Sequence, residues 1–506
     1  MNQIKAGAIL NYVIIGLNTL VGLAYTPYML RCLGQNEYGL YSLVASIIAY
    51  LTLLDFGFGN AIVRYTAKYR AEGKKQEQWE MFGMFLVVYC FIGLIAIGGG
   101  LGLYFNVDAL FDRTMTTSDL GQARIMMLLL TFNLSVTFPF SIFGSIITAY
   151  ENFVFQRVVS ILRIIISTGV LILVLAIGFK AVALVVVQTV FNVLTLVINL
   201  IYCLKKLKIH IIFGKFNWPF IKEISIYSFW IFLNAIMDKI YWGTGQFVLG
   251  AICGTMSVAI FSVAILLQQM YMTFSTSIVS VLLPKVTGMV ALSTTDKEIS
   301  DLFIKTGRIQ SFVMSFILSG FITFGLGFIN LWAGDNYSPA YIITIIFYIS
   351  LFTPLVQNTG IAILQARNQM KFRSILYFII SICSLFLQIV LSRHYAEIGC
   401  AFAIGLALVI GQGIIMNIYY YKKQKIDIPK FWREVGKILI IPTIMTISGL
   451  ILAEYVNFAV VLNLILGIIV FSIIFIILNW KFSLNHYERN LILGPITKRL
   501  HTSKLQ

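Results

Sequence analysis

Charged residues are scarce in this chain: Asp, Glu, Lys and Arg together make up 11% of its 506 residues. About a quarter of the residues of an ordinary soluble domain are charged, so an ordinary soluble protein is excluded. Hydrophobic residues make up 59% of the chain, and its mean hydropathy is +0.90. Because so much apolar surface cannot be hidden from water, the solvent must be lipid. The sequence predicts a polytopic membrane protein.

Motifs of enzyme chemistry are also missing. No P-loop, glycine-rich dinucleotide loop, HExxH or GxSxG pattern occurs where it could work. The six cysteines stand singly in apolar segments without a CxxC spacing, which favours neither a disulfide framework nor a metal site. The longest loop expected outside, roughly 105–121, is too short for a catalytic domain. We therefore expect that the protein is not an enzyme and needs no cofactor or metal.

Apolar segments of roughly 20 residues, separated by short polar breaks, predict fourteen transmembrane helices in an all-α fold. The segments are 6–30, 39–63, 81–104, 122–148, 158–178, 181–203, 223–248, 255–281, 303–330, 339–363, 373–393, 397–420, 433–454 and 457–480. With an internal N-terminus, 31 of the 37 basic residues fall on inside segments and five on outside segments. Lys and Arg are retained on cytoplasmic loops, so both termini are expected in the cytoplasm. The same bias explains the net charge of +17 without nucleic acid.

The chain repeats itself at a constant offset of 216 residues. Matches in one register include Asn18 with Asn234, Tyr25 with Tyr241, Gly144 with Gly360 and Arg157 with Arg373. The repeat predicts two six-helix lobes, 1–210 and 211–425, followed by helices 13 and 14 and a cytoplasmic tail in 426–506. Because six is even, both lobes enter the membrane from the same side. Such a parallel repeat is typical of one class of secondary transporters.

Polar and charged residues within the transmembrane segments are the candidate site. A charge at the bilayer centre costs at least about 2.5 kcal/mol, so a residue that carries one there is expected to have a function. In the seventh segment, polar and small residues share one helical face. They are Tyr227, Trp230, Asn234, Asp238, Tyr241 and Gly245. The equivalent face of the first segment carries Asn11, Asn18, Gly22 and Tyr25. These faces could line a hydrated central cavity or hydrogen-bond helices to one another.

Lys239 is the one basic residue that this map places firmly within a segment. It could bind an anionic ligand, pair with a carboxylate of another segment, or reach an interface with its long side chain. Arg31, at the outer end of the first segment, is also typical of an interfacial arginine.

Asp55 interrupts the apolar stretch LTLLDFGFGNAIVRY of the second segment. It could carry a coupling proton, pair with a buried cation such as Lys239, or orient a helix that Gly57 and Gly59 break. Arg64 is nine residues away, about 13 Å along a helix, which is too far for a direct pair. The repeat-related position is Tyr271, so the carboxylate belongs to one lobe only.

Two stretches resemble signatures of bacterial polysaccharide flippases. Residues 33–73 contain the run LG-x-x-x-YGLY and the pattern DFG-x-G-x-A-x-x-R-Y, and residues 143–157 read FGSIITAYENFVFQR. The family comprises the O-antigen and capsule repeat-unit exporters of the multidrug/oligosaccharidyl-lipid/polysaccharide exporter superfamily. The arrangement of twelve plus two helices resembles this family over essentially the whole chain.

The resemblance implies a flippase of the bacterial cytoplasmic (inner) membrane that works by alternating access in surface polysaccharide biosynthesis. Its substrate would be an undecaprenyl-diphosphate-linked oligosaccharide, moved from the inner to the outer leaflet. Basic residues would contact the diphosphate, and amide and aromatic side chains the sugars. The candidates for the diphosphate contacts are Lys239, Arg31 and Arg64. The candidates for the sugar contacts are Asn18, Asn234, Tyr25, Tyr241, Trp230 and Trp242. The cavity is poor in basic residues for this family.

Asp55 and Asp238 are the candidates for coupling to H+ or Na+ or for charge pairing. Other expected partners are membrane lipid, a polysaccharide polymerase and chain-length proteins. Two other functions stay open. A multidrug/cation antiporter of the same superfamily would favour intramembrane acids without a cavity lysine. A membrane-embedded polymerase or ligase would need a large external loop with catalytic Arg or His, whereas His394 is the lone outside histidine.

Overall fold

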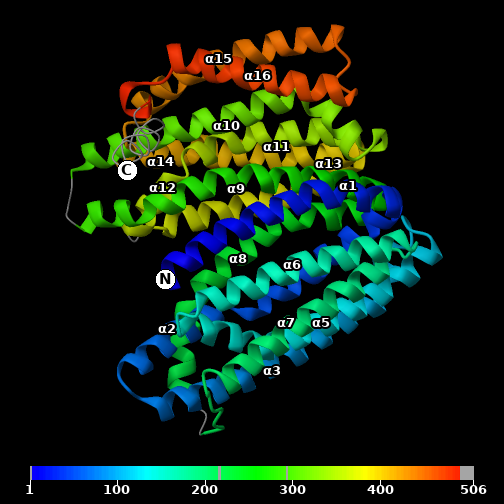
Figure 1. Ribbon diagram of the computed structural model, residues 1–506, viewed down its shortest axis with the longest axis vertical. Helices are drawn as coiled ribbons and strands as arrows, with labels where there is room; N and C mark the ends of the chain where they lie inside the picture. The colour runs from blue at the N-terminus through cyan, green and yellow to red at the C-terminus, as the bar shows by residue number, and fades with distance from the viewer. Residues whose placement is uncertain (1–2, 215–217, 292–294, 368, 490–506) are drawn as a thin grey trace, which may run out of the picture. The chain divides into compact units, whose positions relative to one another are not determined.

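Every regular element is helical in the part of the chain that the computed structural model describes, residues 3–214, 218–291, 295–367 and 369–489 (Figure 1). The all-α prediction is confirmed. The elements of the first half are α1 (Gln3–Leu51), η1 (Thr52–Asp55), α2 (Phe58–Ala71), α3 (Lys75–Phe105), α4 (Val107–Phe111), α5 (Thr117–Ala149), α6 (Phe153–Ala176), α7 (Ala181–Lys205) and α8 (Trp218–Ile252). Those of the second half are α9 (Thr255–Ala291), α10 (Asp296–Trp332), η2 (Asp335–Tyr337), α11 (Pro339–Val356), α12 (Thr359–Ala366), α13 (Lys371–Leu408), η3 (Val409–Ile415), α14 (Met416–Lys422), α15 (Ile428–Tyr455) and α16 (Val461–Phe482).

Eleven helices in the described ranges are long and apolar enough to cross a membrane. Two far exceed the roughly 20 residues that one crossing needs: Ile9–Ala71 has 63 residues and Lys371–Lys422 has 52. Each covers two predicted segments and is interrupted within its length, at Gly34 (φ 74°) and at Ala396 (φ 45°). A multi-pass membrane protein is thus confirmed, and the number of fourteen crossings stays a prediction.

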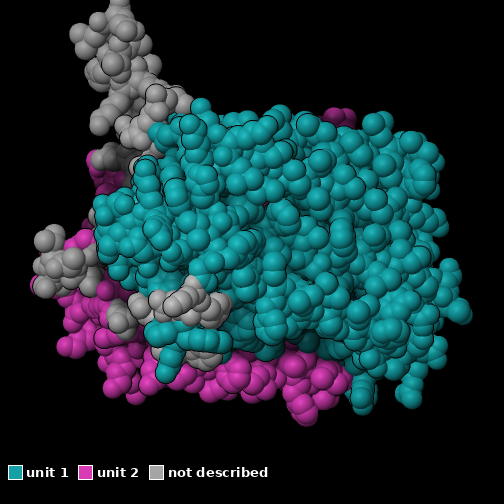
Figure 2. All heavy atoms as spheres, turned by 90° about the horizontal axis from the view of Figure 1, so that it is seen from below, with its two compact units in different colours: residues 1–262, 392–397 teal, residues 263–391, 398–506 magenta. Residues whose placement is uncertain are grey.

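The described chain packs into two compact units, residues 1–262 with 392–397 and residues 263–391 with 398–506, which Figure 2 colours separately. The sequence repeat predicts lobes that meet at residue 210, and this boundary of the repeat stays a prediction. In the first unit, the chain runs along α1, reverses at Gly34 and returns toward α2 (Figure 1).

Close contact between α3 and α5 gives the first unit its core. An added Cβ on Gly100 would lie 2.1 Å from the Thr131 hydroxyl oxygen, and one on Gly93 would lie 3.0 Å from the Ser135 carbonyl oxygen. Small residues allow helices in a membrane to approach this closely. The large buried side chains beside this contact are Phe82, Phe85, Tyr89, Phe138, Ile142 and Ile146. The α3–α5 pair therefore provides a firm support for α2.

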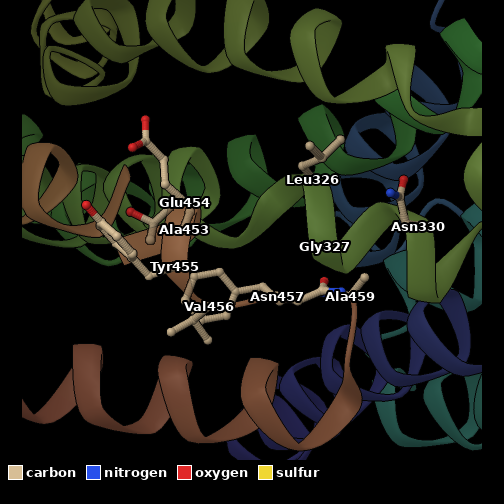
Figure 3. A pocket seen from close by; sticks show the side chains of 11 residues that line it. Leu326, Gly327, Asn330, Ala453, Glu454, Tyr455, Val456, Asn457 and Ala459 are labelled. Atoms are coloured by element: carbon tan, nitrogen blue, oxygen red, sulfur yellow. The ribbon is translucent and has the colours of Figure 1, made fainter. Parts of the chain in front are cut away.

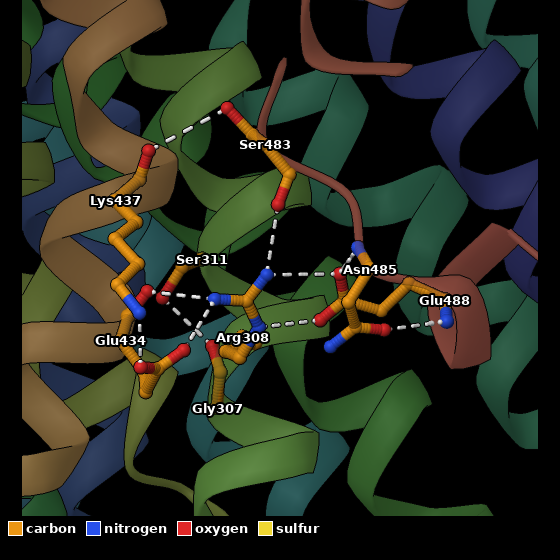
Figure 4. Close-up of polar contacts among 8 residues, drawn as sticks. All are labelled: Gly307, Arg308, Ser311, Glu434, Lys437, Ser483, Asn485 and Glu488. Atoms are coloured by element: carbon orange, nitrogen blue, oxygen red, sulfur yellow. Dashed lines mark hydrogen bonds and ion pairs between the residues drawn. The ribbon is translucent and has the colours of Figure 1, made fainter. Parts of the chain in front are cut away.

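Arg308 of α10 organises the second unit (Figure 4). Its side chain is 5% exposed, and its Nε and Nη2 donate to the two carboxylate oxygens of Glu488 at 2.6 and 3.0 Å. Its Nη1 donates to the Glu434 carboxylate at 3.0 Å, and its Nη2 to the Ser483 carbonyl at 2.9 Å. Glu434 lies on α15 and Glu488 follows α16. One guanidinium thus ties both C-terminal helices to α10.

The outer faces of α15 and α16 are apolar. The large side chains on them, each between 48% and 64% exposed, include Ile440, Ile444, Ile447, Ile451, Leu462, Ile469, Ile473 and Ile477. An apolar patch of this extent is not typical of a protein surface in water. These faces therefore lie against lipid.

Candidate functional site

The helix that carries Asp55 is broken at that residue. After Leu51 the chain forms the 3₁₀ turn η1, and Phe56 (φ 50°) and Gly57 (φ 73°) then adopt left-handed conformations before α2 begins at Phe58. A non-glycine residue rarely adopts such a φ, so Phe56 is a marked exception. The predicted loosening of this helix is confirmed, and the break falls at Phe56–Gly57.

The Asp55 carboxylate lies at this break and is half-buried. The Tyr89 hydroxyl of α3 donates to its Oδ1 at 2.7 Å, and the backbone N–H of Gly57 also donates to it. Tyr89 is fully buried. The geometry of the described residues thus engages Asp55 with the broken helix and with α3, and it shows no ion pair of Asp55 with Lys239.

Helix α8 packs against the same broken helix. The Tyr50 hydroxyl bonds with the Thr244 hydroxyl at 2.7 Å and donates to the Lys239 carbonyl at 3.2 Å. The ring centroids of Phe56 and Phe232 lie 4.5 Å apart. The residues that sequence reasoning singled out on α8 therefore lie next to the break.

The predicted α8 residues differ in exposure. The Lys239 side chain is half-buried and makes no ion pair with any residue that the structure describes, whereas Asp238 is exposed. Tyr241 is fully buried with its ring 5.1 Å from the half-buried Trp242. The side chains of Trp230 and Asn234 lie outside the description, so their predicted role is not tested. The other predicted cations, Arg31 and Arg64, are exposed.

Partly buried polar side chains of α1, α5 and α7 hydrogen-bond with one another. Gln188 of α7 donates to the Tyr41 hydroxyl at 2.8 Å, and Asn192 donates to Asn133 and Thr137 of α5 at 2.7 Å each. Such pairing is the rule, because a buried polar group without a partner loses its hydrogen bonds to water. These pairs join α1, α5 and α7.

Arg163 of α6 has no such polar partner among the described residues. It is the eleventh of the 24 residues of α6, so it lies near the middle of a helix about 36 Å long. Its side chain is partly buried, and no described residue accepts a hydrogen bond from it or pairs with its charge. Gln156, Ser160 and Ser167 share its face of α6. Exposed apolar residues occupy the opposite side of the helix; they include Val158, Leu162, Ile165 and Ile172.

Asn18 lies at about the level of Arg163. Helices α1 and α6 begin side by side: Gln3 accepts a hydrogen bond from Val154 N at 3.3 Å, and an added Cβ on Gly7 would lie 2.6 Å from the Phe153 Cβ. Both helices run away from this end, and ten further residues carry each about 15 Å. Asn18 and Arg163 therefore lie at similar heights on two helices that begin side by side.

The sequence map missed Arg163 because it counted this residue with the cytoplasmic basic residues. The expectation that Lys239 is the one basic residue firmly within a membrane segment stays a prediction, and Arg163 is a second candidate for such a position. α6 begins at Phe153 rather than 158, which moves Arg163 from near the expected inner end to the centre of the helix. The signal that could have found it is the polar spacing of Gln156, Ser160 and Ser167.

The motif LGQNEYG (33–39) forms a polar cluster at the turn of α1. Asn36 donates to Asp119 at 2.9 Å and accepts a hydrogen bond from the Thr255 hydroxyl. The buried Glu37 accepts from Gln122 at 3.1 Å. An added Cβ on Gly39 would lie 1.9 Å from the Thr255 carbonyl oxygen, so only glycine fits here. The motif thus joins the turn of α1 to the start of α5 and of α9.

Solved structures define the class of this fold. The chain matches "Lipid II flippase MurJ, inward closed conformation" with a TM-score of 0.70 and 16% identity, over 94% of this chain and 99% of that one. It matches an inward-facing multidrug resistance MATE family transporter of the MOP superfamily with a TM-score of 0.61 and 12% identity, over 79% of this chain and 92% of that one. The chain therefore has the fold of the MOP superfamily of membrane transporters.

Sequence comparison identifies the family. The family model described as "Polysaccharide biosynthesis protein" matches residues 4–289, more than half of the chain. The chain belongs to this family of polysaccharide biosynthesis proteins. It is also 27% identical over 84 residues to the "Putative O-antigen transporter" of Salmonella typhimurium strain LT2, which covers 16% of this chain and 20% of that protein. The match spans about a fifth of the length of that relative.

Proposed function

We propose that the protein flips an undecaprenyl-diphosphate-linked oligosaccharide from the inner to the outer leaflet of the bacterial cytoplasmic membrane, for surface polysaccharide biosynthesis. The family and the fold support transport in polysaccharide biosynthesis. The proposed orientation has both termini in the cytoplasm, with two six-helix lobes, 1–210 and 211–425, as the parts that alternate.

The observation that carries this proposal is the uncompensated Arg163 in the middle of α6. Arg308, the other buried arginine described above, binds two carboxylates, so the chain provides counter-charges where an arginine has a structural role. A bare cation at membrane depth is costly and is a functional residue by default. Guanidinium binds phosphate oxygens through two parallel hydrogen bonds. A diphosphate would supply the charge that Arg163 lacks.

The neighbouring groups suit the rest of such a substrate. Asn18 and Tyr25 on α1 would face the sugars together with Trp242 on α8, since carboxamides, aromatic hydroxyls and indole N–H groups form hydrogen bonds with sugar hydroxyls. Tyr241, fully buried with its ring 5.1 Å from that of Trp242, would position the indole. Lys239 would supply a second cation. Asn234 and Trp230 stay in this proposal as sugar contacts, and Arg31 and Arg64 as basic residues near the ends of the path.

A multidrug/cation antiporter is the second candidate, because Asp55 is a half-buried acid of the kind that such transport favours. The Asp55 carboxylate, however, is already engaged by Tyr89 and Gly57, whereas the cations Arg163 and Lys239 lack counter-charges among the described residues. Two such cations, together with a carboxylate that is already hydrogen-bonded, favour an anionic substrate over a cationic one. H+ or Na+ coupling through Asp55 or Asp238 remains part of the proposal.

The test compares Arg163→Ala with Arg433→Ala, which removes an exposed arginine of α15. The purified proteins are placed in vesicles with a fluorescent undecaprenyl-diphosphate oligosaccharide, and the fraction that a membrane-impermeant quencher reaches is followed with time. Arg163→Ala should reduce flipping by at least about tenfold, the effect of losing one charge-assisted contact, and Arg433→Ala should leave it unchanged. Undiminished flipping in Arg163→Ala would contradict the assigned diphosphate contact, and no flipping by the intact protein would contradict the function.

A further inference from the structure

A polar pocket of about 370 Å³ lies between the C-terminal end of α10 and the turn that joins α15 to α16 (Figure 3). Its polar side chains are Thr323, Asn330, Glu454, Tyr455 and Asn457. Glu454 is exposed and has no cation paired with it among the residues that the structure describes. All Lys and Arg residues are absent from the sequence between 438 and 480 and between 309 and 366. At this end of the second unit, the negative charge of Glu454 is therefore not balanced by a Lys or Arg from either of these two stretches.

Two carboxamides in the pocket are oriented as hydrogen-bond donors. The Asn457 Oδ1 accepts from the Ala459 N–H at 2.8 Å, and the Asn330 Oδ1 shares the single Ser338 hydroxyl proton, at 2.8 Å, with the Asp335 carbonyl at 2.6 Å. Because the protein itself engages both oxygens, the two NH2 groups remain to donate to a ligand. The pocket thus combines one anionic acceptor with two neutral donors.

An apolar groove of about 510 Å³ continues from this pocket between α15 and α16. Thr323, Val456 and Phe458 line both spaces. Glycines let α15 and α16 pack closely against α10 at the floor of the groove: an added Cβ on Gly449 would lie 2.6 Å from the Thr323 side chain, and one on Gly467 would lie 2.9 Å from the Phe324 ring.

The length of the groove fits a fatty acyl chain. Along α16 its lining runs from Asn463 to Leu478, a rise of about 22 Å. One leaflet contributes about half of the roughly 30 Å hydrocarbon core. An acyl chain that starts at the polar pocket can therefore be enclosed over its whole length.

We propose that the pocket and the groove together bind a phospholipid with a primary-amine headgroup. The ammonium group donates to Glu454, the phosphate accepts from the amides of Asn330 and Asn457, and one acyl chain fills the groove between α15 and α16. This site lies within the second unit and uses none of the residues assigned to the transported substrate. It is a site for a bound membrane lipid, and the proposed function does not depend on it.

Native mass spectrometry of the full-length protein in detergent tests the headgroup. The protein is titrated with phosphatidylethanolamine and with phosphatidylglycerol of the same acyl chains. We expect phosphatidylethanolamine to bind at least about tenfold more tightly, the equivalent of one charge-assisted hydrogen bond. Glu454→Gln should abolish this preference, and Asp335→Asn, which changes another acid near this end, should preserve it. Equal binding of both lipids, or an unchanged preference in Glu454→Gln, would overturn the proposal.

The groove is tested by filling it. Val470 lines the groove and is 52% exposed, and Ile473 on the same helix is equally exposed but does not line it. Val470→Trp should weaken phosphatidylethanolamine binding at least about tenfold, and Ile473→Trp should not, with folding of both verified by circular dichroism. Unchanged binding in Val470→Trp would refute the acyl-chain assignment. Displacement of phosphatidylethanolamine by undecaprenyl phosphate at equal concentration would instead assign the groove to a polyprenyl chain and also overturn the proposal.

Discussion

Tyr89 and Asp55, 34 residues apart in the chain, meet at the break between η1 and α2, where the phenol donates to the carboxylate at 2.7 Å. Phe56 and Gly57 leave the regular helical conformation and interrupt its backbone hydrogen bonds. The Tyr89–Asp55 hydrogen bond supplies a contact where those bonds are lost. Asp55 receives one hydrogen bond from α3 and one from Gly57. The pair therefore fixes the broken helix to the α3–α5 support.

Removing the phenol should weaken this attachment. Tyr89→Phe leaves a half-buried carboxylate with one donor fewer, and we expect a loss of about 1–3 kcal/mol in the free energy of unfolding. Asp55→Asn should cost less, because its carboxamide oxygen still accepts from Tyr89. The measurement is thermal unfolding in detergent, followed by intrinsic fluorescence.

Transport by Asp55→Asn separates the alternatives for this residue. A structural role predicts similar flipping at every pH between about 6 and 8, since neither the amide nor its contacts titrate there. A defect that grows with pH would instead assign a coupling proton to Asp55. The vesicle assay described above measures both outcomes, with the buffer varied on each side of the membrane.

Lys239→Ala should abolish export of the surface glycan while the protein remains in the membrane at normal levels. The reason is that Lys239 is half-buried beside the broken helix and has no ion-pair partner among the described residues. Glycan display is measured in cells that depend on this chain, and membrane abundance by immunoblot. Lys222→Ala, a change of an exposed lysine near the start of α8, is the control. Normal display in Lys239→Ala would remove Lys239 from the mechanism.

Gly39→Ala should separate the turn of α1 from the start of α9. The new methyl group would lie 1.9 Å from the Thr255 carbonyl oxygen, and such overpacking costs about 1–3 kcal/mol. Gly16→Ala on the same helix is the matched control, since nothing lies within 4 Å of its added Cβ. We expect a lower Tm for Gly39→Ala and an unchanged or higher Tm for Gly16→Ala. Equal Tm values for the two variants would show that this close approach does not constrain the protein.

Arg308→Lys should loosen the C-terminal helix pair. A lysine cannot reproduce the paired bonds to Glu488 and the bond to Glu434, and breaking a buried ion pair costs about 3–5 kcal/mol. Limited proteolysis should then release α15 and α16 faster. Lys430→Ala is the control, because it removes a partly exposed ion pair with Asp301 worth at most about 1 kcal/mol. Unchanged proteolysis in Arg308→Lys would show that apolar packing alone holds the pair.

Hydropathy and basic residues could predict the helical membrane fold because both report directly on the solvent around each segment. The sequence also singled out Asp55 and Gly57, where the helix breaks, whereas Gly59 lies within α2. It could not identify Tyr89, which looks like any other aromatic residue of an apolar helix until the fold brings it to Asp55. The central position of Arg163 in α6 could not be predicted, because hydropathy locates a helix end only within several residues and α6 begins five residues before the expected segment.

The order in which the chain is made gives the Arg308 cluster a further meaning. Glu488, its strongest partner, is translated 180 residues after Arg308. During all that synthesis the arginine is in place without this carboxylate, and a chain that stops before α16 never receives it. A buried arginine that lacks one of its carboxylates is destabilised, so a chain cut between 434 and 488 keeps only the Glu434 pair of Arg308 and should hold α10 less firmly. The contact that closes the second unit can therefore form only after the chain has been made through residue 488, so assembly of α10 with α15 and α16 is late in the synthesis of this unit.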